Sequence, residues 1–352
     1  MSRQSVRAIP EDQGLSALAR VLNTDLMLPL LAQAAGLDSG WIQSLGGYAE
    51  MLNHKPGERC TIRYTLTRTG DSAQSVPVAA VIGKLYRSAR LAERMYQRTA
   101  ALRNWPFKSG LPCIPAPLML VSDLGLVLQE NVAAGDLRHL LAAGNNETPM
   151  VLAAQWLARL HTVSPLPELE VRSIERELAK VDQWCADIAP HLPAANTDVV
   201  WLRRTQDGLH RLSGAMPPYT PVMIHKDFYY ANVLWDGHGV WVLDFDQLSI
   251  GDPGLDVAHF LAHLENLAYR ITGQVDSFTQ AAVTFLRSYE EQTGLNLEPR
   301  FPFYRAYTFL KLAATEVSRK RPWQQLAGVL TNLAYREVTG EKGGARIAGA
   351  SR

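Results

Sequence analysis

Residues 224–246 read IHKDFYYANVLWDGHGVWVLDFD and place a cluster of polar residues between two apolar runs. The polar residues of interest are His225, Asp227, Asn232, Asp244 and Asp246. The apolar runs predict strands, so the carboxylates between them lie where water is partly excluded. Carboxylates in such a place are costly unless a cation or a proton balances their charge. The stretch therefore predicts a functional site.

The run DGHG at residues 236–239 has the composition of a hairpin turn, which places Asn232 and Asp244 at the same end of the hairpin. Their amide and carboxylate oxygens are hard ligands of the kind that Mg²⁺ takes. Asp227 precedes Asn232 by five residues and is free to accept a proton or to orient a hydroxyl. Charge neutralisation combined with an orienting carboxylate is what phosphoryl transfer requires.

The composition is that of an ordinary globular protein, with 352 residues, 47% hydrophobic and 20% charged. The formal net charge of +1 gives no global field that favours nucleic acid. No apolar run reaches the roughly 18 residues that span a bilayer. Three cysteines without CxxC spacing predict neither disulfides nor a zinc knuckle. We therefore expect a cytoplasmic protein that binds neither nucleic acid nor membrane, and nothing indicates its oligomeric state.

The hydrophobic periodicity divides the chain into parts of different character. Residues 1–44 are predicted to form an N-terminal helical preface. Residues 45–130 contain three strand-like runs, one helix and two further strand candidates, which predicts a five-stranded antiparallel sheet. Residues 131–337 are mostly helical, and residues 338–352 have little apolar content and are predicted to be disordered. The fold class is therefore α+β, with a sheet lobe followed by a helical lobe.

The pattern H-x-D-x-x-x-x-N followed by D-x-D resembles the catalytic and metal-binding segments of the aminoglycoside phosphotransferase and choline kinase family, relatives of the protein kinases. Other segments resemble the family as well: WLARLH at 156–161, GDPGLD at 251–256, VIGKLY at 81–86 and LQENVAAGDL at 128–137. The resemblance implies a bilobal protein-kinase-like fold. In that fold residues 45–130 bind the nucleotide, and residues 131–337 carry catalysis and bind the acceptor.

The resemblance also implies roles for the residues of the opening stretch. Asp227 is the catalytic base. The implied Mg²⁺ ligands are Asn232, Asp244 and Asp246. Two further residues support the site, namely His225 and Asp256, the second of which anchors the catalytic loop.

The implied cofactors are ATP and Mg²⁺, and the sheet lobe supplies the residues that bind ATP. Lys84 on the third strand grips the α and β phosphates, and Glu93 in the next helix is its candidate ion-pair partner. Gly57 and Arg59 belong to the turn at 54–59, which covers the phosphates. The assignment of that turn rests on position, because it lacks the G-x-G-x-x-G of protein kinases.

Two short segments complete the predicted site. Gln129, Glu130 and Asn131 resemble the hinge whose backbone meets adenine. Tyr229 and Tyr230 stand beside the predicted base, where they line the acceptor pocket or pack the loop. The sequence leaves these two interpretations open.

Two further features have alternative interpretations. Lys226 stands where many relatives have glycine, and its side chain either alters acceptor access or points away from the site. His259 and His263 lie four residues apart and have the spacing of zinc ligands. No third ligand is evident, and their apolar neighbours favour helix packing.

The resemblance implies ATP-dependent transfer of a phosphoryl group to a hydroxyl of a small molecule, with an aminoglycoside or other antibiotic as the leading acceptor. The alternatives are a sugar or amino-alcohol (choline-like) kinase and a nucleotide-binding pseudokinase. Acidic residues in the helical part favour a cationic or sugar-like acceptor, or else form a solvated helix face: Glu168, Glu170, Glu175, Glu177, Asp182, Asp187 and Glu265.

Overall fold

The computed structural model describes residues 11–69, 75–104, 107, 113–144, 146–192, 197–318 and 324–341. The chain divides into two compact units. The sheet unit comprises Met1–Ala134 and Trp241–Asp246, and the helical unit comprises Gly135–Val240 and Gln247–Arg352. The segment that carries the D-x-D motif therefore belongs with the sheet, although it follows the first part of the helical unit along the chain.

Five strands form the sheet in the order β1-β2-β3-β5-β4, and each neighbouring pair is antiparallel. They are β1 (Leu45–Lys55), β2 (Arg59–Thr69), β3 (Ser75–Tyr86), β4 (Pro117–Val121) and β5 (Leu126–Glu130). Alternation along β2 sets the two faces, because Ile62 and Tyr64 are fully buried while Arg63 between them is exposed. The predicted antiparallel sheet is confirmed.

Two helices of the preface cover one face of this sheet: α1 (Leu18–Leu22) and α2 (Thr24–Ala34). Leu31 of α2 is fully buried in a cluster that includes Ile62. The hydroxyl of Tyr64 donates a hydrogen bond of 2.8 Å to the carbonyl of Val21 at the end of α1. The preface is thus part of the core of the sheet unit.

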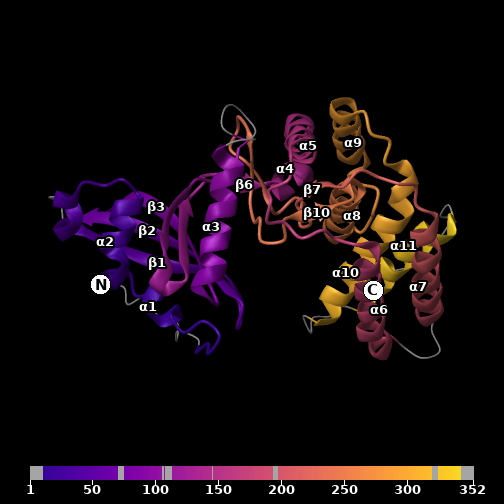
Figure 1. The fold of residues 1–352 in the computed structure, drawn as a ribbon, viewed down its shortest axis with the longest axis horizontal. Coiled ribbons are helices and arrows are strands. Elements are labelled where there is room, and N and C mark those ends of the chain that lie inside the picture. The colour runs from indigo at the N-terminus through magenta and orange to yellow at the C-terminus, as the bar shows by residue number, and fades with distance from the viewer. Residues whose placement is uncertain are drawn as a thin grey trace. The chain divides into compact units, whose positions relative to one another are not determined.

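The opposite face carries the helix α3 (Ala89–Asn104). Ala92 and Met95 of α3 are buried in a second cluster with Tyr86 and Val127 of the sheet. Figure 1 shows α2 and α3 on opposite sides of the strands. The sheet is therefore covered on both faces, and the residues of β2 and β3 that point toward α3 are the ones relevant to the site.

Helices make up most of the helical unit: α4 (Leu137–Ala143), α5 (Glu147–Thr162), α6 (Ile174–Ile188), α7 (Thr197–Ala215), α8 (Pro253–Thr272), α9 (Thr279–Thr293), α10 (Phe301–Ser318) and α11 (Gln324–Thr339). Short 3₁₀ turns lie at Ser39–Ser44, Ser122–Leu124, Ala189–His191 and Glu298–Arg300. Helix α11 extends into the segment predicted to be a disordered tail, and residues 342–352 of that segment lie outside the described residues.

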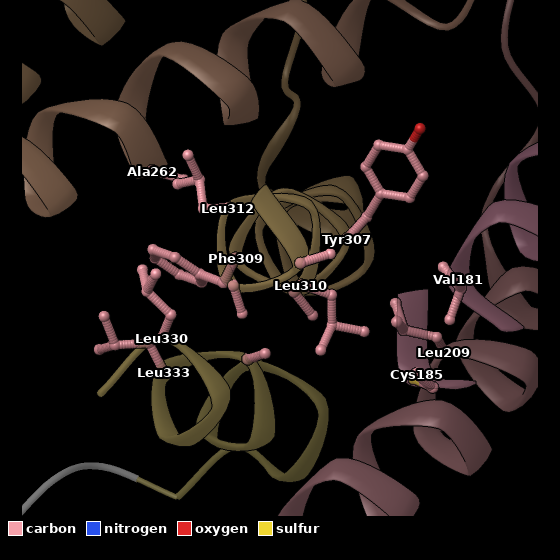
Figure 2. Packing of buried hydrophobic residues seen from close by; sticks show 14 of the residues in the cluster. Val181, Cys185, Leu209, Ala262, Tyr307, Phe309, Leu310, Leu312, Leu330 and Leu333 are labelled. Atoms are coloured by element: carbon pink, nitrogen blue, oxygen red, sulfur yellow. The ribbon is translucent and has the colours of Figure 1, made fainter. Parts of the chain in front are cut away.

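Helix α10 lies in the middle of the core of the helical unit. Its apolar side chains pack against α6, α7, α8 and α11. In Figure 2, Leu330 and Leu333 of α11 lie on one side of α10, and Val181 of α6 lies on another. A helix held from several sides cannot rotate freely, so the few polar side chains that it carries are kept in fixed positions.

Short strands frame the motif segment: β6 (Gly135–Asp136), β7 (Val222–Ile224), β8 (Val233–Trp235), β9 (Val240–Val242) and β10 (Ser249–Gly251). Strand β7 pairs antiparallel with β10, and β6 pairs antiparallel with β8. The turn between β8 and β9 is closed by a hydrogen bond of 3.3 Å from the amide of Asp236 to the carbonyl of Gly239. The predicted polar turn is therefore present.

The predicted α+β class, with an antiparallel sheet first and helices after it, is confirmed. Within the described ranges, none of the helices combines the length and the hydropathy needed to cross a bilayer.

Replacing Leu31 by alanine tests whether the preface stabilises the sheet unit. Leu31 is fully buried, so we expect the free energy of unfolding to fall by about 2–5 kcal/mol. Leu26→Ala on the same helix is the matched control, because Leu26 is 60% exposed and its loss should change stability by less than about 0.5 kcal/mol. Urea unfolding measures both variants. Equal effects would show that α2 does not stabilise this core.

Candidate functional site

The predicted site residues fall into two groups, one in each unit. The helical unit holds His225, Asp227, Tyr229, Tyr230, Asn232 and Asp256. The sheet unit holds Gly57, Arg59, Lys84, Glu93, Gln129, Glu130, Asn131, Asp244 and Asp246. Each group has its own geometry.

In the helical unit, the carboxylate of Asp256 holds the loop that follows β7. Asp256 lies in the first turn of α8 and is fully buried. It accepts hydrogen bonds of 2.6 Å from the amides of His225 and Lys226, and it lies 3.2 Å from Nε2 of His161. Burial alone would raise the pKa of Asp256, but its hydrogen bonds and charge interactions with His161 and His225 together outweigh burial, and the pKa is lowered. The loop is therefore attached to a carboxylate that stays ionised.

The attached loop has an uncommon backbone conformation just before the predicted base. Lys226 has a φ of 69°, in the left-handed region that favours glycine. Immediately after it, the amide of Asp227 donates to Nδ1 of His225 at 3.3 Å. The side-chain amide of Asn232 donates to the carbonyl of Asp227 at 2.8 Å. That contact uses the nitrogen of Asn232 and leaves its oxygen, the atom that a cation would bind, unused by this bond.

Asp227 lies between two basic side chains of the helical unit. Its Oδ1 is 3.3 Å from Nζ of Lys311 and 3.7 Å from Nε2 of His259. Burial alone would raise the pKa of Asp227, but the contact with His259 and the charge of Lys311 outweigh it and lower the pKa below its usual range. Asp227 is therefore a carboxylate at neutral pH, suited to orient a hydroxyl and to accept its proton late in a transfer.

His259 and His263 are buried on one face of α8, with ring centroids 4.3 Å apart. Burial, and then the nearby charge of Lys311, lower the pKa of His259 to about 4, so the ring is neutral at pH 7. Within the described part of the chain, Nε2 of His259 and Nδ1 of His263 have no hydrogen-bond partner. No group of three or more His, Cys, Asp or Glu side chains that could hold a metal is found there either.

The two tyrosines beside the base have different surroundings. Tyr230 is buried, with its ring 5.7 Å below the guanidinium of Arg138, whereas Tyr229 is partly exposed. Both rings pack against His263, with centroid distances of 4.5 Å for Tyr229 and 6.1 Å for Tyr230. Packing therefore accounts for Tyr230, and Tyr229 is the better placed of the two to meet an acceptor.

Lys226 points into the core of the helical unit. Its Nζ lies 2.7 Å from Oε1 of Glu177 on α6. Glu177 also contacts Lys180 at 3.0 Å and receives a hydrogen bond from the hydroxyl of Tyr307. Burial alone would raise the pKa of Glu177, but the charge and hydrogen bond of Lys226, the hydrogen bond from Tyr307 and the charge of Lys180 together outweigh burial and lower the pKa to about 2. Lys226 thus connects the loop to α6 through Glu177, and Glu177 connects it to α10 through Tyr307.

In the sheet unit, the D-x-D carboxylates meet the guanidinium of Arg59 at the start of β2. The guanidinium donates to both oxygens of Asp244 at 2.8 Å and also contacts Asp246. The hydroxyl of Tyr86 donates to Asp246 at 3.0 Å. Asp244 has a φ of 67°, an uncommon conformation for a residue other than glycine, which often marks a functional position.

Lys84 lies near the same carboxylates. Its Nζ is 4.0 Å from Oδ1 of Asp244. The predicted ion pair with Glu93 is absent from the described residues, because Glu93 is exposed and accepts a hydrogen bond of 3.3 Å from Gln97 instead. Helix α3 presents Arg98 to this region, and its guanidinium donates to the carbonyl of Phe245 at 3.2 Å.

The turn after β1 is held from the N-terminal segment. Asp12 accepts hydrogen bonds of 3.0 and 3.1 Å from the amide of Gly57, and it lies 2.8 Å from Nε2 of His54. Gly57 has a φ of 75°, which explains the glycine at this position. The turn is therefore fixed by a side chain rather than by a glycine-rich sequence.

The predicted hinge begins at the end of β5, where Gln129 pairs with Ile82 of β3. The carboxylate of Glu130 accepts from the amide of Ala116 at 2.9 Å, and the amide of Glu130 donates to the carbonyl of Ala116 at 2.8 Å. Asn131 follows as a half-buried residue. The Glu130 side chain is thus occupied within the protein.

Sequence reasoning missed several residues that contact the predicted site. Lys311 had a usable signal, because it is a charged residue within the apolar stretch FYRAYTFLKLAATEV of α10. The sequence contained no signal for three other residues, Asp12, Tyr86 and Arg98. Each is an ordinary polar residue far along the chain from its partner. His259 was noticed, but as a zinc-ligand candidate or a packing residue and not as a neighbour of Asp227.

Comparisons with known proteins bear on the family and the fold of the chain. A family model described as the phosphotransferase enzyme family matches residues 68–298, more than half of the chain. A sequence search among curated proteins found no significant match.

Solved structures with a similar fold include a choline kinase from Cryptosporidium parvum, with a TM-score of 0.60 and 10% identity over 90% of this chain and 96% of that one. A ternary complex of aminoglycoside phosphotransferase APH(4)-Ia with AMP-PNP and hygromycin B gives a TM-score of 0.56 and 16% identity over 90% and 99%. A type I macrolide 2'-phosphotransferase gives 0.52 and 17% over 88% and 97%. The predicted kinase-like fold is confirmed.

Replacing Glu177 by glutamine tests the ion pair between Lys226 of the loop and Glu177 of α6. The variant leaves Lys226 buried without its counter-charge, so we expect the free energy of unfolding at pH 7 to fall by about 3–5 kcal/mol. Glu175→Gln on the same helix is the control, because Glu175 is exposed and should matter little.

The difference in stability between wild type and Glu177→Gln should depend on pH. The pKa of Glu177 is lowered from 4.5 to about 2, so its contribution is present above pH 4.5 and is lost as the pH falls toward 2. The stability difference between wild type and Glu177→Gln should therefore shrink over that range in urea unfolding. A difference that stays constant from pH 5 to 2 would contradict an ionised Glu177.

Proposed function

Because the chain belongs to the phosphotransferase enzyme family, we propose that it transfers the γ-phosphoryl group of ATP to a hydroxyl of a small molecule. The observation that carries the proposal is the state of Asp227. It is a partly exposed, ionised carboxylate on a loop that Asp256 holds by two backbone hydrogen bonds of 2.6 Å. A fixed carboxylate that can orient an incoming hydroxyl is what in-line transfer needs from the protein.

In this proposal Asp227 is the catalytic base, and His225 and Asp256 keep it in place. Lys311 is a further residue of the site, since its ammonium contacts Asp227 at 3.3 Å. It keeps Asp227 ionised and adds positive charge where the transferring phosphoryl group is negative.

Mg²⁺ would be held by Asn232, Asp244 and Asp246. The residues fit a hard cation, because they offer amide and carboxylate oxygens, and those of Asp244 and Asp246 lie close enough together to contact the same guanidinium. When bound, Mg²⁺ would neutralise charge on the phosphates of the nucleotide.

The remaining residues of the sheet unit would bind ATP. We assign the phosphates to Lys84, Gly57 and Arg59, and the adenine to the backbone of Gln129, Glu130 and Asn131. Glu93 has no partner role toward Lys84 in this structure, so a contribution to nucleotide binding would require a rearrangement of α3. The pseudokinase alternative is less favoured, because the residues that we assign as the base, the phosphate-binding lysine and the D-x-D carboxylates are all present in the sequence.

For the acceptor we keep the candidates that the sequence suggested: an aminoglycoside or other antibiotic, a sugar, or a choline-like amino alcohol. The acidic residues do not discriminate between these acceptors, because several of them form ion pairs within the protein. Glu177 pairs with Lys226, and Glu265 pairs with Arg305 at 2.7 Å. A neutral, hydroxyl-rich acceptor is therefore as well supported as a cationic one.

Transfer of labelled phosphate from ATP to a panel of acceptors tests the proposed function. The panel contains aminoglycosides, other antibiotics, sugars, choline, ethanolamine and a generic protein. We expect labelling of one class of small molecule, and Asp227→Asn should lower turnover by about 10²–10⁴-fold while nucleotide binding persists. Labelling of the protein alone, or near wild-type turnover by Asp227→Asn, would contradict the proposal.

Replacing Lys311 by methionine tests its electrostatic role. The charge of Lys311 lowers the pKa of Asp227, so its removal should raise that pKa and move the acidic limb of kcat/KM to higher pH. Lys311→Arg keeps the charge and should leave the limb nearly in place. Identical acidic limbs in wild type and Lys311→Met would show that Lys311 does not act on Asp227.

A further inference from the structure

The guanidinium of Arg59 occupies the oxygens that the proposed metal would need. Its two terminal nitrogens donate to the two oxygens of Asp244 at 2.8 Å each, which is bidentate geometry. One of them also contacts Asp246. Arg59, Asp244 and Asp246 are all partly buried, with side chains 16–19% exposed.

The charges of this cluster already balance. Arg59 and Lys84 supply two positive charges, and Asp244 and Asp246 supply two negative charges. Burial alone would lower the pKa of Arg59, but its hydrogen bonds and charge interactions with the two carboxylates outweigh it and raise the pKa, so the guanidinium is permanently charged. A divalent cation added to this arrangement would meet a bound cation on the same oxygens and would be repelled by it.

We propose that Arg59 is an internal counter-ion of the D-x-D pair, which keeps Mg²⁺ off Asp244 and Asp246 until the phosphates of a nucleotide draw the guanidinium away. This inference rests on the proposed function, because it takes Mg–ATP as the ligand. A guanidinium binds phosphate with the same bidentate geometry that it uses for carboxylate, so a polyphosphate is a chemically matched second partner. Metal and nucleotide would therefore bind together.

The backbone around Arg59 allows such an exchange without a change of fold. Arg59 is paired with Lys55 of β1 on one side and with Tyr86 of β3 on the other. Asp12 holds the preceding turn through the amide of Gly57. Only the long side chain of Arg59 has to move, and rotamer changes of this kind are fast compared with turnover.

The carboxylates remain held when the guanidinium leaves. Asp246 keeps the hydrogen bond of 3.0 Å from Tyr86, and Arg98 keeps its hydrogen bond to the carbonyl of Phe245. Lys84 stays 4.0 Å from Asp244. The two aspartates are thus positioned to receive a metal in place of Arg59.

Binding of Mn²⁺ to the full-length protein, measured by electron paramagnetic resonance without nucleotide, tests the inference. Arg59→Met should bind Mn²⁺ about ten-fold or more tightly than wild type, because a cation is removed from the metal ligands. Arg63→Met is the matched control, since Arg63 lies on the same face of β2 but pairs with the exposed Glu50 at 3.5 Å. It should bind Mn²⁺ like wild type. Arg59→Gln serves as a second variant if Arg59→Met does not fold, with the same expected direction.

The titration is repeated with AMP-PNP present. The gap in Mn²⁺ affinity between wild type and Arg59→Met should then narrow, because the nucleotide has already displaced the guanidinium in wild type. If both proteins bind Mn²⁺ with AMP-PNP but the variant gains nothing without it, only the counter-ion role of Arg59 is overturned. If neither protein binds Mn²⁺ even with AMP-PNP, the proposed function and this inference fail together.

Discussion

The buried carboxylate of Asp256 is the interaction on which the arrangement of the helical unit's site depends. A fully buried carboxylate is tolerated only when its oxygens are hydrogen-bonded, and those of Asp256 meet two backbone amides and His161. His161 is in turn 2.7 Å from the hydroxyl of Tyr289. These contacts join α5, α8 and α9 to the loop after β7. Lys226, whose amide is one of the two, has the left-handed conformation, and Asp227 comes directly after it.

Each unit balances its acidic site residues before any ligand arrives. In the helical unit, Lys311 and the neutral His259 face Asp227. In the sheet unit, Arg59 and Lys84 face Asp244 and Asp246. Ionised side chains in partly buried places need such partners, and the partners also lower the cost of keeping the carboxylates ionised. The same cations suit a ligand that is itself anionic, as nucleotide phosphates are.

The sequence predicted the parts of the fold that depend on local pattern. Alternation in β2 and helical spacing in α10 were visible because each reflects burial of one face. The proposed catalytic segment was visible because Asp227, Asn232, Asp244 and Asp246 are close together in the chain. Contacts between distant segments were not visible. Arg59 and Asp244 are separated by 185 residues, and Lys311 and Asp227 by 84, and no spacing rule joins such pairs.

The predicted pairing of Lys84 with Glu93 also shows that tertiary contacts cannot be predicted from local sequence. The resemblance supplied the pair, but α3 turns Glu93 to the surface and presents Arg98 to the D-x-D segment instead. The orientation of a helix depends on which of its residues pack, here Ala92 and Met95 against the sheet. The orientation of α3 is therefore determined by tertiary packing and not by its charged residues.

A crystal structure of the protein with AMP-PNP and Mg²⁺ would show whether a metal replaces Arg59 on the D-x-D carboxylates. We expect the metal to be bonded to oxygens of Asp244 and Asp246 and the guanidinium of Arg59 to have moved from Asp244 to the phosphates. Asp227 should stay bound to its loop partners. A nucleotide bound elsewhere, or a metal bonded to other residues while Arg59 remains bidentate on Asp244, would contradict this expectation.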